Sequence, residues 1–134
     1  MGLIGLLAAS TAVWVVARWR PFRVEVSGGS MEPTLLPGDW VLATVARRVD
    51  RGDVVVIGHP LNLGMEMVKR LTGVPGDRVL PDRALDPDEW FVSGDNADAS
   101  TDSRTFGPVS RADIVGRARL VYWPPGRIGV IRGR

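Results

Sequence analysis

Glycine and proline divide most of this chain into short apolar runs, and this division constrains the fold more than any other feature. The sequence holds 16 glycines and 10 prolines, several of them in turn sequences such as Pro-Gly-Asp and Arg-Gly-Asp. The runs between these turns are β-branched or alternate apolar with polar residues, as strands do. We therefore expect a mainly β fold, a single small barrel or sandwich, with strands over residues 23–26, 40–45, 54–57, 65–72, 90–93 and 114–122.

The first residues differ in character from the rest of the chain. Gly2–Ala17 carries no charged side chain, and Arg18, Trp19 and Arg20 follow it directly. As a helix this run would span about 24 Å, slightly less than a comfortable membrane crossing requires. A signal peptide would need a basic start and a cleavage site, and a core helix in a small domain would have a polar face. We therefore expect residues 1–20 to form a membrane anchor helix in contact with lipid.

The remainder of the chain is expected to form one domain and a short tail. Residues 21–126 contain all the predicted strands, and no internal repeat divides them. Residues 127–134 are basic and are expected to fray. The net charge of +2 and the scattered arginines do not favour nucleic-acid binding. The sequence has no cysteine, which excludes disulfides and cysteine-based metal sites, and we expect no metal and no cofactor.

One residue type is almost missing from the chain. Lysine and arginine total 17, but Lys69 is the single lysine. In a strand, Lys69 would share a face with Met65, Met67 and Leu71, and burial there would lower its pKa. A lysine with a lowered pKa can act as a general base at neutral pH, whereas arginine cannot lose its proton. The competing interpretation is a lysine that blunts an edge strand.

A glycine-rich segment near the start of the β domain could present a nucleophile to such a base. In Ser27–Leu35, Gly28 and Gly29 precede Ser30 and allow the backbone to approach a ligand closely, and Met31 follows. The competing interpretation is a Gly-Ser turn without any catalytic role, which is the more common structure for such a sequence.

A long polar loop, Gly94–Gly107, contains the third group of candidate residues. It holds the hydroxyl of Ser100, and Asp102 and Arg104 are spaced so that they could pair. Polar loops of this length in a small domain tend to be functional. The competing interpretations are a solvated loop or a calcium site, although the acidic spacing does not match an EF-hand.

Together these segments resemble the signal peptidase I family of Ser–Lys proteases, which includes bacterial leader peptidases and mitochondrial inner-membrane peptidases. The resemblance covers Val24 to Trp123. It rests on four boxes in the family's order: Ser30–Leu35 (SMEPTL), Arg51–Val55 (RGDVV), Val68–Asp77 (VKRLTGVPGD) and Gly94–Val109 (GDNADASTDSRTFGPV). The family requires a lysine at the position that Lys69 occupies.

The resemblance implies a mechanism for this chain. Ser30 Oγ would attack the scissile carbonyl, and neutral Lys69 would take its proton and later protonate the leaving amine. Ser100 would hold the lysine amine in place, and Asp102 and Arg104 would brace the loop.

The resemblance also implies a substrate and an oxyanion site. The backbone N–H of Ser30 would be one oxyanion donor, within a substrate loop that includes Gly28, Gly29 and Met31. Some relatives have a second donor hydroxyl two residues before the nucleophile, where this chain has Gly28. Substrates would be exported preproteins with small residues one and three positions before the cut.

The resemblance leaves several functions open. The favoured one is a membrane-bound serine endopeptidase that removes signal or leader peptides. The alternatives are a maturation protease for one pro-enzyme, such as a nickel superoxide dismutase precursor, a self-cleaving repressor, or a catalytically dead membrane-anchored peptide-binding domain. The resemblance places the domain outside the cytoplasm on a single-pass anchor in the cell (inner) membrane, whereas Arg18, Arg20 and Arg23 after the apolar run argue for the opposite topology.

Overall fold

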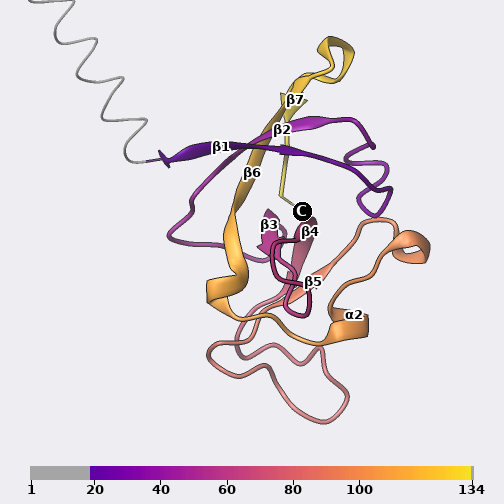
Figure 1. Cartoon of the computed structure of the whole chain (residues 1–134). Coiled ribbons are helices and arrows are strands. Elements are labelled where there is room, and N and C mark those ends of the chain that lie inside the picture. Colours follow the sequence, from indigo (N-terminus) through magenta and orange to yellow (C-terminus); the bar gives the residue numbers. More distant parts are fainter. Residues whose placement is uncertain (1–18, 134) are drawn as a thin grey trace, which may run out of the picture.

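The structure is a computed structural model that describes residues 19–133, and a single antiparallel sheet dominates it (Figure 1). The sheet order is β1-β2-β6-β3-β4-β5, and β7 also pairs with β6. The strands are β1 (Pro21–Glu25), β2 (Trp40–Thr44), β3 (Val54–Gly58), β4 (Glu66–Gly73), β5 (Phe91–Ser93), β6 (Ile114–Trp123) and β7 (Gly129–Val130). The helical segments are short: η1 (Ala97–Ala99), α2 (Ser103–Phe106), η2 (Arg111–Asp113) and η3 (Pro125–Arg127).

The expectation of a mainly β fold is confirmed, but the expectation of a barrel or sandwich is wrong. Each predicted strand is present with its ends shifted by at most two residues. Among the described residues the sheet is open, because β1 and β5 lie at its two ends and do not pair. Closure depends on register and bulges, which the alternation of side chains does not encode.

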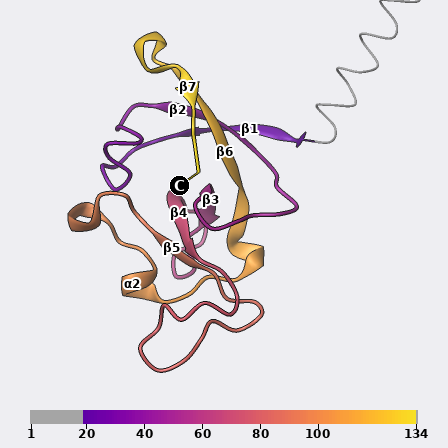
Figure 2. The same cartoon turned by 180° about the vertical axis from the view of Figure 1, so that it is seen from behind.

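Strand β3 explains how an open sheet builds a stable core. Val54 and Val56 face one apolar cluster, and Val55 and Ile57 face another, so both faces of β3 are buried. A continuous β-branched run is typical of such a central strand. Figures 1 and 2 show β1, β2 and β7 at one end of the molecule, and β5 and α2 at the other. Strand β4, which carries one of the functional residues described below, lies between these two ends.

The C-terminal tail is ordered, contrary to the expectation that it frays. Gly129 and Val130 pair with β6, and the Ile131 N–H donates to the Arg119 carbonyl at 2.9 Å. The side chain of Arg70 also donates to the Arg132 carbonyl. The tail therefore packs on the domain as far as the structure describes it.

The predicted anchor lies almost wholly outside the described residues, since the structure describes the chain only from residue 19. Within residues 19–133, no helix has the length and apolar character that a membrane crossing requires.

Candidate active site

The turn that carries Ser30 lies between β1 and β2, and two apolar side chains buried in the core hold it in place. Met31 and Leu35 are almost completely buried in the first core cluster, and the Leu35 N–H donates to the Met31 carbonyl. Met31, which we expected in the substrate loop, thus anchors the turn as well as lining the pocket beside it. This anchoring holds Ser30 at the surface of a rigid turn.

Lys69 lies in β4 and is only 4 % exposed. Desolvation lowers its pKa below the ordinary lysine value, the negative charge of Asp102 partly opposes this shift, and the positive charge of Arg104 adds to it. Strand β4 pairs with β3 from Glu66 to Arg70, whereas β5 pairs only with its second half, from Arg70 onward. A buried lysine does not present a charge to solvent, so the edge-blunting interpretation does not fit.

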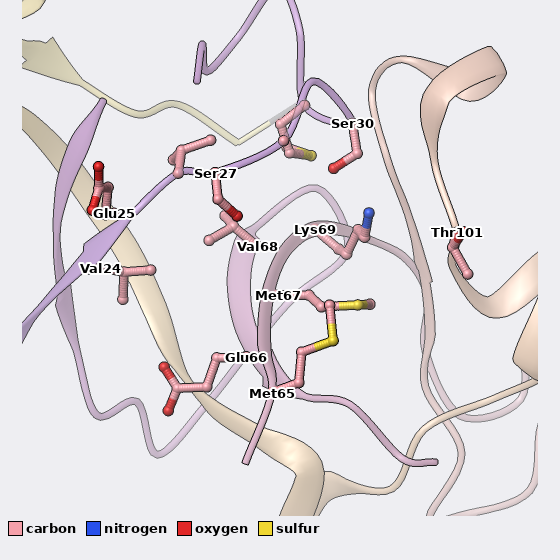
Figure 3. Close-up of a pocket in the computed structure, with 13 residues that line it drawn as sticks. Val24, Glu25, Ser27, Ser30, Met65, Glu66, Met67, Val68, Lys69 and Thr101 are labelled. Carbon is pink, nitrogen blue, oxygen red and sulfur yellow. The ribbon is translucent and has the colours of Figure 1, made fainter. Parts of the chain in front are cut away.

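Ser30 and Lys69 face the same open pocket, which has a volume of about 190 Å³ (Figure 3). The Ser30 hydroxyl and the Lys69 amine point toward one another across it, although no hydrogen bond joins them within the described residues. The walls come from the end of β1 with the turn after it, and from the start of β4; the lining residues are Val24, Glu25, Val26, Ser27, Gly28, Ser30, Met31, Met65, Glu66, Met67, Val68, Lys69 and Thr101.

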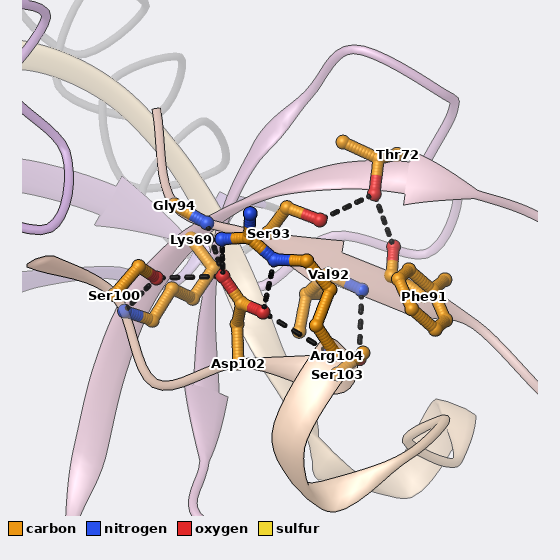
Figure 4. A network of polar contacts seen from close by, with 10 residues as sticks. All are labelled: Lys69, Thr72, Phe91, Val92, Ser93, Gly94, Ser100, Asp102, Ser103 and Arg104. Carbon is orange, nitrogen blue, oxygen red and sulfur yellow. Dashed lines mark hydrogen bonds and ion pairs between the residues drawn. The ribbon is translucent and has the colours of Figure 1, made fainter. Parts of the chain in front are cut away.

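The Lys69 amine is held by a chain of short polar contacts (Figure 4). Lys69 Nζ donates to Ser100 Oγ at 3.1 Å, and Ser100 Oγ donates to Asp102 Oδ2 at 2.6 Å. Because the Ser100 proton is committed to the carboxylate, the Ser100 oxygen acts as an acceptor toward the lysine. The chain therefore fixes the direction of one lysine N–H.

Asp102 is fully buried and is the centre of this network. Burial by itself would raise the pKa of Asp102, but hydrogen bonds from the Arg104 guanidinium, the Ser100 hydroxyl and the backbone N–H groups of Gly94 and Arg104 outweigh it. The net effect holds the pKa of Asp102 far below its usual range. Asp102 is therefore a permanent anion, and its guanidinium partner at 2.6 Å compensates its charge.

A second network, which the sequence did not reveal, joins the same loop to the Ser30 turn. The Asn96 N–H donates to the Ser30 carbonyl at 2.8 Å, and the Asn96 side chain donates to the Gly29 carbonyl at 3.1 Å. The Asp95 carboxylate takes two hydrogen bonds from Arg70 at 2.8 Å and one from the Thr34 hydroxyl. These contacts fix the Ser30 turn relative to β4.

The candidate residues therefore fall into two groups in space. Ser30, Gly28 and Lys69 line the pocket. The residues Ser100, Asp102 and Arg104 do not line it and form the hydrogen-bonded chain that holds the lysine amine. Gly29 contributes a backbone acceptor rather than a pocket wall. Asp95, Asn96 and Thr101 were not among the predicted site residues. All three lie inside the Gly94–Val109 box, but the sequence did not show that the first two contact the Ser30 turn or that Thr101 lines the pocket. Among residues 19–133, no cluster of three potential metal ligands is present.

Comparison with known proteins agrees with the motifs. The family model for signal peptidase, peptidase S26, matches residues 1–85 and 79–123. The chain belongs to this family. Subunit 2 of the mitochondrial inner membrane protease of Saccharomyces cerevisiae is 34% identical, with 78% of this chain and 70% of the relative covered. Human subunit 1 of that protease is 34% identical (81% and 74% covered), and the Arabidopsis thaliana mitochondrial ATP-independent inner membrane protease subunit 1a is 38% identical (81% and 74%). The family and the names of these relatives identify a peptidase.

Proposed function

We propose that this peptidase is a membrane-bound serine endopeptidase that cleaves signal or leader peptides, with Ser30 as nucleophile and Lys69 as general base. The observation that carries the proposal is the environment of the single lysine. It is 4 % exposed, its pKa is lowered by desolvation, and it faces the pocket that Ser30 also lines. A lysine with a lowered pKa that faces a serine hydroxyl can activate that hydroxyl as a nucleophile without a histidine.

In the proposed reaction, Lys69 takes the Ser30 proton as Ser30 Oγ attacks the scissile carbonyl, and it later delivers that proton to the leaving amine. Ser100 keeps one lysine N–H occupied, so the lone pair of the amine is directed away from Ser100. The Ser100 hydroxyl donates its hydrogen bond to Asp102, and in this proposal Ser100 therefore does not compete with Ser30 as a nucleophile.

The backbone of the Ser30 turn supports a role for the Ser30 N–H as an oxyanion donor. Within the described residues, this N–H donates to no acceptor and is free for a ligand. A backbone N–H aimed at the developing oxyanion stabilises the tetrahedral intermediate without reorganisation. The second donor is not supplied by a side chain at Gly28.

The substrate would bind in an extended conformation along the first half of β4. Residues 66–69 have a sheet partner only on their β3 side among the described residues, so the other backbone edge can pair with a peptide. The pocket beside this edge has a volume of about 190 Å³, a size that suits the small residues expected one and three positions before the cut.

The membrane location is part of the proposal and has independent support. Three of the relatives are named as inner membrane proteases, and the uncharged run Gly2–Ala17 would anchor this chain beside its substrates. We propose a single-pass anchor with the domain on the extracytoplasmic side. Protease treatment of intact cells compared with inverted vesicles measures this topology directly.

The mechanism is tested by Lys69→Arg. If Lys69 acts only as a cation, Arg preserves its charge and activity; if it acts as a base, activity is lost, because arginine has no accessible neutral form. Ser30→Ala should be equally inactive, and the double variant no worse, since residues that act as a unit are not additive. Arg51→Lys, on an exposed side chain, is the matched control and should keep full activity. A folded Lys69→Arg protein that cleaves a signal-peptide substrate at near wild-type rate would falsify the mechanism.

A further inference from the structure

A second pocket, of about 260 Å³, lies at the opposite end of β1 from Ser30. Trp19, directly before β1, forms one wall, and the chain after β2 forms another. The lining residues are Trp19, Val45, Ala46, Arg47, Arg48 and Arg119. Three arginines beside an exposed tryptophan and an exposed valine have no part in the proposed peptidase mechanism.

The arginines of this pocket differ from most others in the domain because none of them forms an ion pair with a carboxylate among the described residues. Six arginines form ion pairs with carboxylates: Arg51, Arg70, Arg83, Arg104, Arg117 and Arg127. Among the described residues, no acidic side chain pairs with Arg47, Arg48 or Arg119. The pocket therefore carries three positive charges that no direct ion pair offsets in this part of the chain, and only the more distant carboxylate of Asp53 acts on Arg119.

The guanidinium of Arg119 is held in a fixed position in this pocket. Its Nε donates to the Thr44 hydroxyl at 2.8 Å, and its guanidinium carbon lies 4.8 Å from the centre of the Trp19 ring. Desolvation lowers the pKa of Arg119, the neighbouring charge of Arg117 adds to this shift and that of Asp53 partly opposes it, so the net effect disfavours the charge of Arg119. An anion in the pocket would compensate that charge, and the exposed Arg47 and Arg48 could close on it.

The surrounding residues indicate which anion fits. Trp19 is 45% exposed and Val45 43% exposed, so apolar surface adjoins the cationic pocket. Tryptophan next to arginine is typical of the membrane interface, where the ring meets acyl chains and the guanidinium meets phosphate. Trp19, which forms one wall of the pocket, also lies only two residues after the uncharged run Gly2–Ala17 in the sequence. A lipid phosphate satisfies both the charge and the apolar rim.

We propose that this pocket binds the phosphate group of an anionic phospholipid, with Arg47, Arg48 and Arg119 as ligands and Trp19 against the acyl region. The site is separate from Ser30 and Lys69, and lipid binding there does not depend on peptidase activity.

Native mass spectrometry of the full chain in detergent tests the proposal. The detergent-solubilised protein is titrated with a short-chain phosphatidylglycerol, with the matching phosphatidylcholine, and with inorganic phosphate alone. We expect phosphatidylglycerol to bind preferentially, and Arg48→Gln to weaken it about fivefold, the usual contribution of one arginine near an anionic membrane surface. Arg47→Gln with Arg48→Gln should weaken it further.

Arg78→Gln is the matched control, because Arg78 is also exposed and has no carboxylate partner among the described residues, yet lies outside the pocket. It removes the same charge and should leave phosphatidylglycerol affinity unchanged. Equal weakening by Arg48→Gln and Arg78→Gln would overturn the proposal, because the effect would then be one of net charge. Equal binding of the two lipids, or displacement of the lipid by inorganic phosphate at similar concentration, would also overturn it.

Discussion

Asp95 and Asp102 belong to the same loop, their side chains are both less than a tenth exposed, and both accept two hydrogen bonds from an arginine guanidinium, yet their surroundings differ. Asp102 pairs with Arg104, a near neighbour in sequence whose side chain is 44% exposed. Asp95 pairs with Arg70 of β4, and in that pair both side chains are less than a tenth exposed. One pair is local and partly open to solvent, and the other is long-range and closed.

The remaining contacts of the two carboxylates show what this difference means. Asp102 also accepts a hydrogen bond from the Ser100 hydroxyl, and Ser100 in turn accepts one from Lys69. Asp102 therefore acts on the protonation and the direction of the Lys69 amine. Asp95 also accepts from Thr34, so it joins β4 to the turn that carries Ser30. In the proposed mechanism, the first carboxylate controls proton transfer and the second controls the distance between base and nucleophile.

The largest effect is expected at Gly94, where the two networks meet. A Cβ at this position would lie 2.3 Å from Ser100 Oγ and 2.5 Å from the Ser30 carbonyl oxygen. Gly94→Ala must therefore displace both the lysine support and the Ser30 turn, and we expect kcat to fall by about 10³-fold or more, since small misplacements are costly. Overpacking should also destabilise the fold by about 1–3 kcal/mol.

Gly126→Ala is the matched control for Gly94→Ala, because nothing lies within 4 Å of a Cβ at that position. Peptide cleavage and thermal unfolding of both variants measure the effect. A Gly94→Ala protein with wild-type kcat would show that catalysis does not depend on the close packing of the two networks at Gly94.

Ser100→Ala separates the Asp102 network from the Asp95 network. It removes the acceptor that holds Lys69 and leaves the Asp95 contacts intact. We expect kcat to fall about 10²-fold, the typical contribution of a positioned general base, with little change in KM. Circular dichroism should show an unchanged fold. A folded variant with unchanged kcat would remove Ser100 from the site.

Arg70→Gln tests the Asp95 network in the same way. Removing one partner of a buried ion pair leaves an uncompensated charge, and we expect a loss of about 3 kcal/mol in the free energy of unfolding. The effect on kcat of the folded protein should be smaller than that of Ser100→Ala, because the base keeps its acceptor. Arg51→Gln, in an exposed pair with Asp77, is the control and should hardly change stability. Equal stability changes in the two variants would contradict the comparison.

The sequence predicted one of these networks much better than the other, for a physical reason. Ser100, Asp102 and Arg104 are close in sequence, so their spacing already indicated a pair and a hydroxyl beside it. Asp95 and Asn96 act on residues more than sixty positions away, and only the packing of the loop against the Ser30 turn defines those contacts.

The fold shows the same limit of prediction. Periodicity predicted six strands, because each is a local pattern. It did not predict the open sheet, because the strand order depends on pairing with β6, which is distant in sequence from β2 and β3. It did not predict β7 either, because a strand of two residues is too short to show a periodic pattern.

The smallest expected effect concerns stability and comes from Lys69 itself. Its pKa is lowered in the folded state, so between that pKa and about 10.4 the unfolded chain binds more protons, and wild-type stability falls as pH falls through this window. Lys69→Met removes the titrating group, and we expect it to be inactive but more stable at pH 7, by on the order of 1 kcal/mol. The same depressed pKa predicts that wild-type activity rises with pH through it.

The stability gain of Lys69→Met should shrink as pH approaches 10, because wild-type lysine is then increasingly neutral in both folded and unfolded chains. Urea unfolding at pH 7 and pH 10 measures this difference. Arg78→Met is the control, since it replaces an exposed arginine, a residue type that keeps its charge in proteins, and its effect should not depend on pH. If Lys69→Met were less stable relative to wild type at pH 7 than at pH 10, the buried lysine would be contributing to the fold through its charge. It could not then be the neutral base that the comparison of the two carboxylates assigns to the Asp102 network.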